Sequence, residues 1–178
     1  ETLYGDVMVC EDAHRHGRAF CRVASDYEKF YNTIQLTCVD AVDECRGIPE
    51  CARRLVLEAF DGVQVAIRTK WRSAPPILVT RGAPQGSVGG PEVAKPAQEP
   101  ILRLRESSPA AYVTQSGRRV ACFGYVDDDE HYGSGARDLP VIADELGAGS
   151  AACGVGFSWP KSSAFASDWG AAALDPGA

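Results

Sequence analysis

Two short segments, far apart in the sequence, each have the pattern of a β-strand with one apolar face, and an aspartate follows each of them. Residues 19–25 are followed by Asp26, and residues 118–126 are followed by Asp127, 101 positions later. Side chains alternate along a β-strand, so each segment can turn an apolar face to a core while its aspartate lies on the opposite face. If the two strands are neighbours, Asp26 and Asp127 meet at the open side of one sheet.

Two carboxylates brought together in this way need a cation. At a separation of ~4 Å and an effective dielectric constant of about 20 they repel by roughly 4 kcal/mol, a cost that bound Mg²⁺ reverses. Two such ions, ~3.5–4 Å apart, activate a hydroxyl nucleophile and stabilise the leaving oxygen of a phosphoryl transfer. The alternative is that Asp127 and Asp128 are solvated residues of a hairpin turn.

The remaining patterns predict an α+β layered fold. Apolar residues recur at helical spacing directly after Asp26, and a capping box at Thr37 and Asp40 predicts the start of another helix. Glycines, prolines and β-branched residues mark most other boundaries. The expected helices are residues 3–16, 27–34, 37–46, 49–60 and 91–105, and the expected strands are 19–25, 63–67, 77–80, 118–126 and 129–132.

The size and charge of the chain limit its function. Its 178 residues suit one domain, and its net charge of −6 has the wrong sign for binding nucleic acid by bulk electrostatics, so a polyanion would need locally placed bases. The longest uncharged run, residues 146–160, is too short to cross a bilayer. Because the chain begins with Glu1 and has no basic and apolar leader, we expect a piece of a longer chain without a secretory signal.

The seven cysteines are odd in number, scattered and never spaced as C-x-x-C. This usage favours a reducing intracellular compartment, nuclear or cytoplasmic. Cys38, Cys45 and Cys51 lie close in sequence, but their spacing is not that of a zinc site, and we expect core thiols on apolar faces.

Four segments resemble, in order, the motifs of reverse transcriptases. Residues 123–128 (Phe-Gly-Tyr-Val-Asp-Asp) resemble the aromatic-x-Asp-Asp motif, and residues 81–86 (Arg-Gly-Ala-Pro-Gln-Gly) resemble the Arg-Gly-x-Pro-Gln-Gly motif. Residues 26–31 look like the first catalytic motif, and residues 154–161 look like the later glycine-to-lysine motif. Residues 10–17 (Cys-Glu-Asp-Ala-His-Arg-His-Gly) are similar to the lead-in of retrotransposon polymerases that lack long terminal repeats. The resemblance covers nearly the whole chain.

The resemblance implies an antiparallel-sheet polymerase palm packed on helices, with part of the fingers, over residues 1–178. Most of the fingers and the thumb would lie elsewhere in a longer chain. Such an enzyme, an RNA-directed DNA polymerase, extends the 3′-hydroxyl of a DNA primer with dNTPs along an RNA template. Asp26 and Asp127 would hold two Mg²⁺ ions, or Mn²⁺ in their place. The implied catalytic residues are Asp26, Asp127, Asp128 and Lys161, and the implied substrate-binding residues are Tyr31, Arg81, Gln85, Gly86 and Tyr125.

Several of these roles have a plainer alternative. Asp128 would point elsewhere in an ideal strand and would reach the site from a turn, in a supporting role. Tyr31 would lie under the incoming sugar or be a core aromatic, and Gln85 would contact nucleotide and template or occupy a plain turn. Lys161 would donate a proton to the departing pyrophosphate, neutralise its charge, or simply be solvated. Three arginines supply either positive charge near the active face or only solubility: Arg81, Arg118 and Arg119.

The sequence departs from the family pattern at two places. Pro96 lies inside an expected helix, where proline ordinarily costs ~3 kcal/mol, so we expect this helix to kink or to start later. Asp129 and Glu130 place charge where the family tends to have apolar residues. A degenerate, catalytically inactive reverse-transcriptase-like domain is therefore the main alternative. A calcium-binding loop at Asp127, Asp129 and His131 and an unrelated domain are weaker alternatives.

Overall fold

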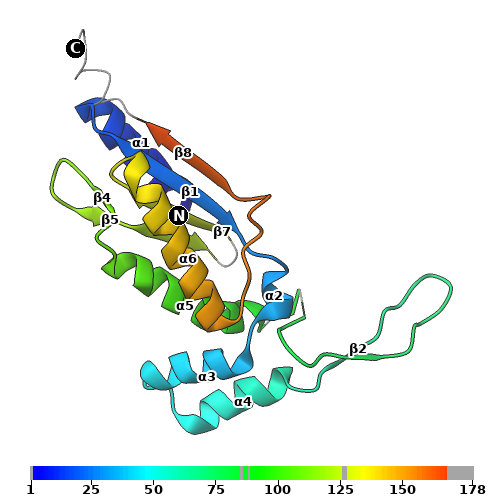
Figure 1. The fold of residues 1–178 in the computed structure, drawn as a ribbon. Coiled ribbons are helices and arrows are strands. Elements are labelled where there is room, and N and C mark those ends of the chain that lie inside the picture. The colour runs from blue at the N-terminus through cyan, green and yellow to red at the C-terminus, as the bar shows by residue number, and fades with distance from the viewer. Residues whose placement is uncertain (1, 85, 88, 126–127, 168–178) are drawn as a thin grey trace.

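A four-stranded antiparallel sheet forms the centre of the molecule in the computed structural model, which describes residues 2–84, 86–87, 89–125 and 128–167. Its strand order is β6-β7-β1-β8 (Figure 1). The strands are β1 (Phe20–Asp26), β6 (Cys122–Tyr125), β7 (Asp128–Gly133) and β8 (Ser163–Ser167). The predicted α+β class, with helices packed on an antiparallel sheet, is confirmed.

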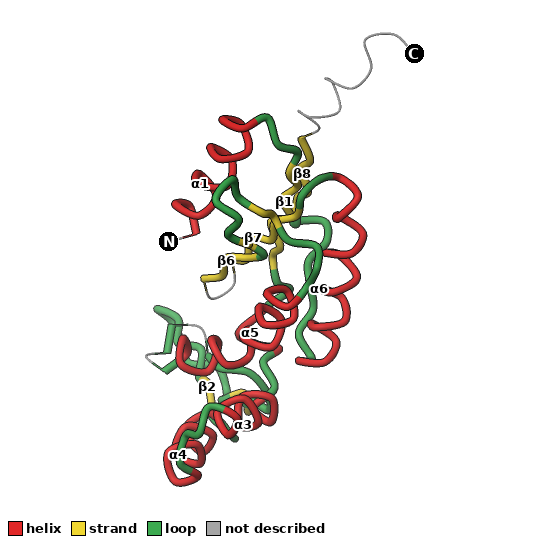
Figure 2. The backbone as a smooth tube through the Cα atoms, turned by 90° about the vertical axis from the view of Figure 1, so that its left-hand side faces the viewer, coloured by secondary structure: helices red, strands yellow, loops and turns green. Residues whose placement is uncertain are grey.

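Helices cover the sheet on both faces. Figure 2 shows α1 (Thr2–His16) on one side of β1 and β7, and α6 (Leu139–Cys153) on the other. Alongside α6 lies α5 (Gly90–Ser107). Two hydrophobic clusters result, one between the sheet and α5 and α6, and a smaller one beneath α1.

The alternation along β1 explains why the sheet is covered twice. Cys21 and Val23 are buried in the cluster with α5 and α6, whereas Phe20 is buried in the cluster with α1. Ser25 is buried and Asp26 is only partly covered. The strand predicted for residues 19–25, ending at an aspartate, is therefore confirmed to within one residue.

The other elements connect these layers. Between β1 and α5 the chain forms three helices and a two-stranded hairpin, and a second small hairpin joins α5 to β6. These elements are α2 (Phe30–Thr33), α3 (Leu36–Cys45), α4 (Glu50–Phe60), β2 (Gln64–Val65), β3 (Ile77–Leu78), β4 (Tyr112–Val113), β5 (Arg119–Val120) and η1 (Ala136–Asp138). Within the described residues, no helix is long and apolar enough to span a membrane.

Three sequence-based expectations about these elements are wrong. The N-cap of α3 is Gln35, with no side-chain bond, so Thr37 lies inside the helix and is not its cap. The helix that contains Pro96 begins at Gly90, so the later start is wrong and the kink stays a prediction; the helix continues past the proline, with its buried face packed on α3 and α6. The single strand expected over residues 118–126 is divided at Ala121 into β5 and β6, which belong to different sheets.

The expectation of three core thiols also fails in part. Cys38 packs against the main cluster, but Cys45 and Cys51 are exposed. Cys45 is the last residue of α3 and Cys51 lies in the first turn of α4, so both are at helix ends rather than on a packed face.

Candidate active site

The end of β1 is held in place by the segment that precedes β8. The backbone N–H of Asp26 donates a hydrogen bond to Ser162 Oγ at 3.2 Å, and its carbonyl accepts one from the N–H of Ser158 at 2.7 Å. One residue further, Tyr27 forms an isolated β-bridge with Phe157. The glycine-to-lysine segment of residues 154–161 therefore lies beside Asp26.

Asp128 lies directly opposite Asp26. The strand beside β1 is β7, the returning arm of the hairpin, and its register pairs Asp26 with Asp128 and Ala24 with Glu130. Directly opposed side chains of an antiparallel pair share a face, with Cβ atoms ~4.5–5.5 Å apart. Asp128 thus begins a strand and does not reach the site from a turn, which corrects its expected placement. Asp127, the other expected partner of Asp26, lies outside the described residues.

The two facing carboxylates are incompletely compensated. Asp26 Oδ2 is buried and accepts no hydrogen bond from any described residue, and its nearest cation is Lys161, with Nζ 3.6 Å away. Lys161 is 73% exposed, so solvent weakens this ion pair. The side chain of Asp128 is exposed, with neither hydrogen bond nor ion pair to the described part of the chain. Hard oxygen ligands at close quarters, one of them buried without a donor, fit a divalent cation.

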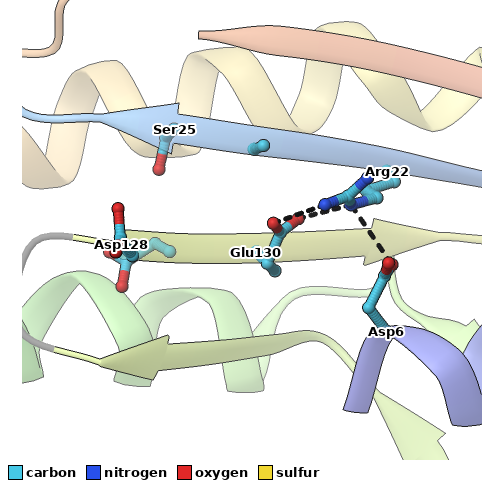
Figure 3. Close-up of a pocket in the computed structure, with 7 residues that line it drawn as sticks. Asp6, Arg22, Ser25, Asp128 and Glu130 are labelled. Atoms are coloured by element: carbon cyan, nitrogen blue, oxygen red, sulfur yellow. Dashed lines mark hydrogen bonds and ion pairs between the residues drawn. The ribbon is translucent and has the colours of Figure 1, made fainter. Parts of the chain in front are cut away.

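The neighbouring acids have partners. Arg22 forms two hydrogen bonds with Glu130, 2.5 and 2.6 Å long, and its Nε lies 3.2 Å from Asp6 of α1 (Figure 3). These groups and Asp128 line a recess of about 240 Å³ on the sheet. Because Arg22 engages Glu130 and Asp6, the charge left open at this end of the sheet, among the described acids, is that of Asp26 and Asp128.

Asp129 lies on the opposite, buried face of β7. Its carboxylate is 2% exposed and accepts hydrogen bonds from the hydroxyl of Tyr27, at 2.5 Å, and from the side-chain amide of Gln98. Burial and the Asp129 charge together raise the pKa of Tyr27 above its ordinary value, so the hydroxyl remains a donor. This arrangement connects the residue after Asp26 with the residue after Asp128.

The positions of Asp129 and His131 contradict the alternative of a calcium-binding loop. Both lie on a strand with buried side chains, and His131 is within hydrogen-bonding distance of Ser25 Oγ, at 3.2 Å. Burial, with a smaller effect of Arg105, lowers the pKa of His131 to about 3, so the ring is neutral. Among the residues that the structure covers, no group of three His, Cys, Asp or Glu side chains forms a metal site.

The loop that follows Arg81 is fastened to the residues after Asp26. Gly82 N–H donates to Ile34 O at 3.0 Å and Ala83 N–H donates to Tyr31 O at 2.7 Å. Gly82 has φ of 78°, and a Cβ there would lie 2.2 Å from Tyr31 O, so only glycine allows this approach. Tyr31 is half-buried, with its ring 6.0 Å from that of Phe30.

The structure gives fewer contacts for the other expected substrate-binding residues. Gly86 is exposed, whereas Gln85 lies outside the described residues. The backbone of Tyr125 pairs with Asp128. Arg81 is exposed at a separate recess of about 420 Å³, which Asp40 and Asp61 also line.

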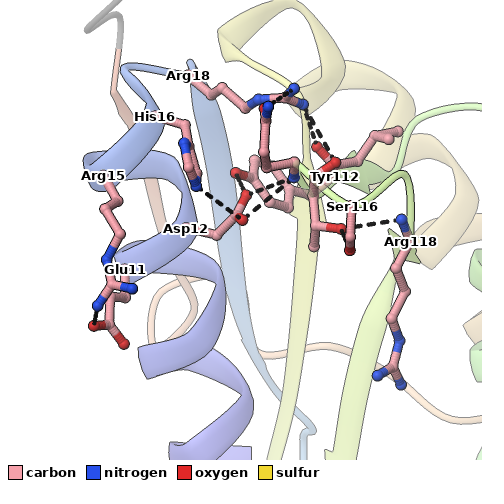
Figure 4. Close-up of polar contacts among 11 residues, drawn as sticks. Glu11, Asp12, Arg15, His16, Arg18, Tyr112, Ser116 and Arg118 are labelled. Atoms are coloured by element: carbon pink, nitrogen blue, oxygen red, sulfur yellow. Dashed lines mark hydrogen bonds and ion pairs between the residues drawn. The ribbon is translucent and has the colours of Figure 1, made fainter.

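Two further arginines belong to the β4–β5 hairpin and its turn. Arg118 lines a recess of about 310 Å³ beside Asp12, in a network of polar contacts between α1 and the β4–β5 hairpin (Figure 4). Arg119 donates to the carbonyl of Ser108. Within the described chain neither arginine shares a recess or contact with Asp26 or Asp128; the backbone N–H of Arg118 bonds Thr114 Oγ1 in the hairpin turn, and the Arg119 side chain ties the hairpin to Ser108.

Sequence reasoning did not assign a site role to Tyr27, Gln98 or Arg22. Tyr27 is the first of the apolar residues that recur at helical spacing after Asp26. Its aromatic ring predicts burial and does not indicate a bond to Asp129. Gln98 had one detectable signal, a polar residue among the apolar residues of a helix, and Arg22 shares the face of β1 that carries Asp26.

Comparisons with known proteins give a fold. No family model and no curated protein matches the sequence. Apo telomerase from Candida tropicalis, truncated from its C-terminal domain, superposes with a TM-score of 0.64 at 10% identity, covering 91% of this chain and 34% of that one. Telomerase from the same organism in complex with a TWJ fragment of telomeric RNA superposes with a TM-score of 0.63 at 10% identity, covering 91% of this chain and 28% of that one.

The fold is therefore shared with a part of these telomerase chains. The present chain spans about a third of their length.

Proposed function

We propose that this chain carries the palm, with part of the fingers, of an RNA-directed DNA polymerase. The observation that supports the proposal most strongly is the register of β1 and β7, which sets Asp26 opposite Asp128, with one buried oxygen of Asp26 that accepts no hydrogen bond from the described residues. The order of the sequence motifs supports an enzyme resembling those of retrotransposons without long terminal repeats.

In the proposed reaction, the 3′-hydroxyl of a primer attacks the α-phosphorus of a dNTP and pyrophosphate leaves. Asp26, Asp127 and Asp128 would hold two Mg²⁺ ions, with Mn²⁺ as a substitute. Bound there, the ions would lower the pKa of the hydroxyl and offset the charge that develops on the phosphoryl oxygens.

The chain's own residues would position the reactants. Lys161, 3.6 Å from Asp26 Oδ2, is close enough to the carboxylates to neutralise the departing pyrophosphate or give it a proton. Tyr31 supports the loop of residues 81–86 through its carbonyl, and in the proposal its ring lies beneath the incoming sugar. Gln85, Gly86, Arg81 and Tyr125 would contact nucleotide and template.

The proposed partners are an RNA template, a DNA primer and dNTPs, together with fingers and thumb parts outside these residues. One of the telomerase structures with this fold contains an RNA fragment, which supports a nucleic-acid partner. The exposed thiols of Cys45 and Cys51 suit our proposal of a reducing intracellular compartment, nuclear or cytoplasmic.

Single-nucleotide primer extension by the complete gene product tests the proposal. We expect Asp26→Asn to lower the rate of addition by at least ~100-fold, because loss of a direct metal ligand should exceed the 10–100-fold effects typical of outer-shell partners. Asp144→Asn, an exposed position on α6, is the matched control and should retain activity. Full activity of Asp26→Asn at saturating Mg²⁺ would refute the proposal. A wild-type protein that folds but adds no nucleotide would instead favour the degenerate, inactive domain.

A further inference from the structure

A two-stranded arm, residues 63–80, projects away from the helices that carry it (Figure 1). In the part of the chain that the structure describes, strands β2 and β3 pair with each other and with no other strand. The arm carries three basic residues, Arg68, Lys70 and Arg72, and no acidic residue, in a chain whose net charge is −6. All three are exposed, and none makes an ion pair with a described residue. The arm therefore presents an isolated positive charge.

An aromatic ring stands among these charges at the tip. Trp71 is 85% exposed, and Lys70 Nζ lies 5.2 Å from the centre of its ring. The Thr69 hydroxyl donates to the carbonyl of Arg72 at 2.8 Å and accepts from the N–H groups of Trp71 and Arg72. These bonds fix the turn, so the ring and the flanking cations are presented by an ordered backbone.

The composition of the tip indicates the chemistry of a partner. A large exposed aromatic ring offers a stacking surface, and neighbouring cations attract phosphates; together they are the two elements by which proteins bind single strands. A base that is already paired inside a duplex cannot stack on such a ring. The tip thus suits an unpaired strand better than a duplex.

We propose that this arm binds single-stranded nucleic acid, with an unpaired base on Trp71 and the phosphate backbone along Arg68, Lys70 and Arg72. The interaction needs neither a divalent cation nor the carboxylates Asp26 and Asp128. It therefore goes beyond the proposed polymerase activity, and either can fail without the other.

Fluorescence anisotropy of the 178-residue chain with labelled 12-nucleotide RNA, DNA and duplex probes, in EDTA, tests the proposal. Trp71→Ala should weaken single-strand binding by about 5- to 150-fold, the range for loss of one stacked base, whereas Trp71→Phe should retain most of it. The triple variant R68Q/K70Q/R72Q should reduce the salt slope, log Kd against log salt, by about 2. Comparison of RNA with DNA shows which strand the arm prefers.

The matched control is R15Q/R54Q/R137Q, which removes the same charge from three exposed arginines elsewhere. We expect it to leave the affinity within about threefold, and a far-UV spectrum confirms that each variant is folded. Equal loss in the control would overturn the proposal, because a general charge effect would then account for the binding. Unchanged affinity in both Trp71→Ala and the arm triple would also overturn it, and the apolar residues Ile77 and Leu78 would then point to a protein partner.

Discussion

A buried carboxylate, Asp129, determines how the two aspartate-bearing strand ends are held. It is bonded by Tyr27, which follows Asp26, and by Gln98 of α5. A buried charge without donors would be costly, so these bonds favour one position of β7 relative to β1. Asp129, which stands where the resembled family tends to have an apolar residue, is thus hydrogen-bonded on the packed face of the sheet.

We expect Tyr27→Phe to lower the free energy of unfolding by about 1–3 kcal/mol, because it leaves a buried carboxylate short of a donor while the ring still packs. Urea denaturation measures the change. A double-mutant cycle with Gln98→Leu should give a coupling energy well above the error, because both side chains bond Asp129. Strict additivity would show that the two bonds act independently and would argue against a shared anchor.

His131 should make the protein less stable in mild acid. Its pKa is lowered to about 3 in the fold by burial, from an ordinary 6.5, so the unfolded chain binds the extra proton between these values. Stability from this ring is full above pH 6.5 and is lost as the pH falls, by roughly 1.5 kcal/mol between pH 6.5 and 5. His131→Gln should flatten the pH dependence of urea unfolding by that amount, whereas an unchanged profile would contradict the neutral buried ring.

At the scale of elements, the sequence predicts local features well and pairing poorly. The alternation of β1 and the hairpin at residues 122–133 follow from period-two patterns, and the arm follows from β-branched runs around a turn. The sequence does not say that β7, rather than β6, lies beside β1. That register comes from long-range packing, and it makes Asp128 a neighbour of Asp26.

The helix α5 is the element where local rules fail most. The proline inside it predicts a kink or a later start, but the helix begins at Gly90, and buried residues such as Val93, Ala97 and Ile101 pack along its length against its neighbours. Tertiary burial therefore outweighs intrinsic propensity here. The same burial places Gln98 beneath β7, where no local pattern predicts its bond to Asp129.

Replacing Pro100 should stabilise the fold. Pro100 has no N–H, so the carbonyl four residues earlier lacks its helical donor, and Pro100→Ala should raise the free energy of unfolding by about 1–3 kcal/mol. A gain in flexibility of the unfolded chain offsets part of this. Pro91→Ala is the control, because Pro91 lies in the first turn, where proline is favourable. Thermal melting of both variants measures the change in stability. A lower melting temperature for Pro100→Ala would contradict the prediction that Pro100 destabilises α5.

Across the whole molecule many opposite charges are paired, such as Arg22 with Glu130 and Arg53 with Asp40, and two groups of like charge stand out against them. The open end of the sheet carries Asp26 and Asp128, and the basic residues of the arm lie in a distant hairpin, although the chain as a whole has a net charge of −6. This pattern suits a protein that attracts cations at one place and phosphates at another, and does not attract duplexes over its entire surface.

Melting temperatures measured with and without Mn²⁺ test the proposed divalent cation site at the facing carboxylates of Asp26 and Asp128. Without the cation, Asp128→Asn should stabilise the chain by about 0.2–1 kcal/mol, because directly opposed like charges are destabilising. With Mn²⁺, the wild type and the Asp144→Asn control should melt at a higher temperature, because an ion that binds only the folded chain stabilises it. The melting temperature of Asp128→Asn should rise much less. An equal response of Asp128→Asn and Asp144→Asn, or no response of the wild type at millimolar Mn²⁺, would contradict the account.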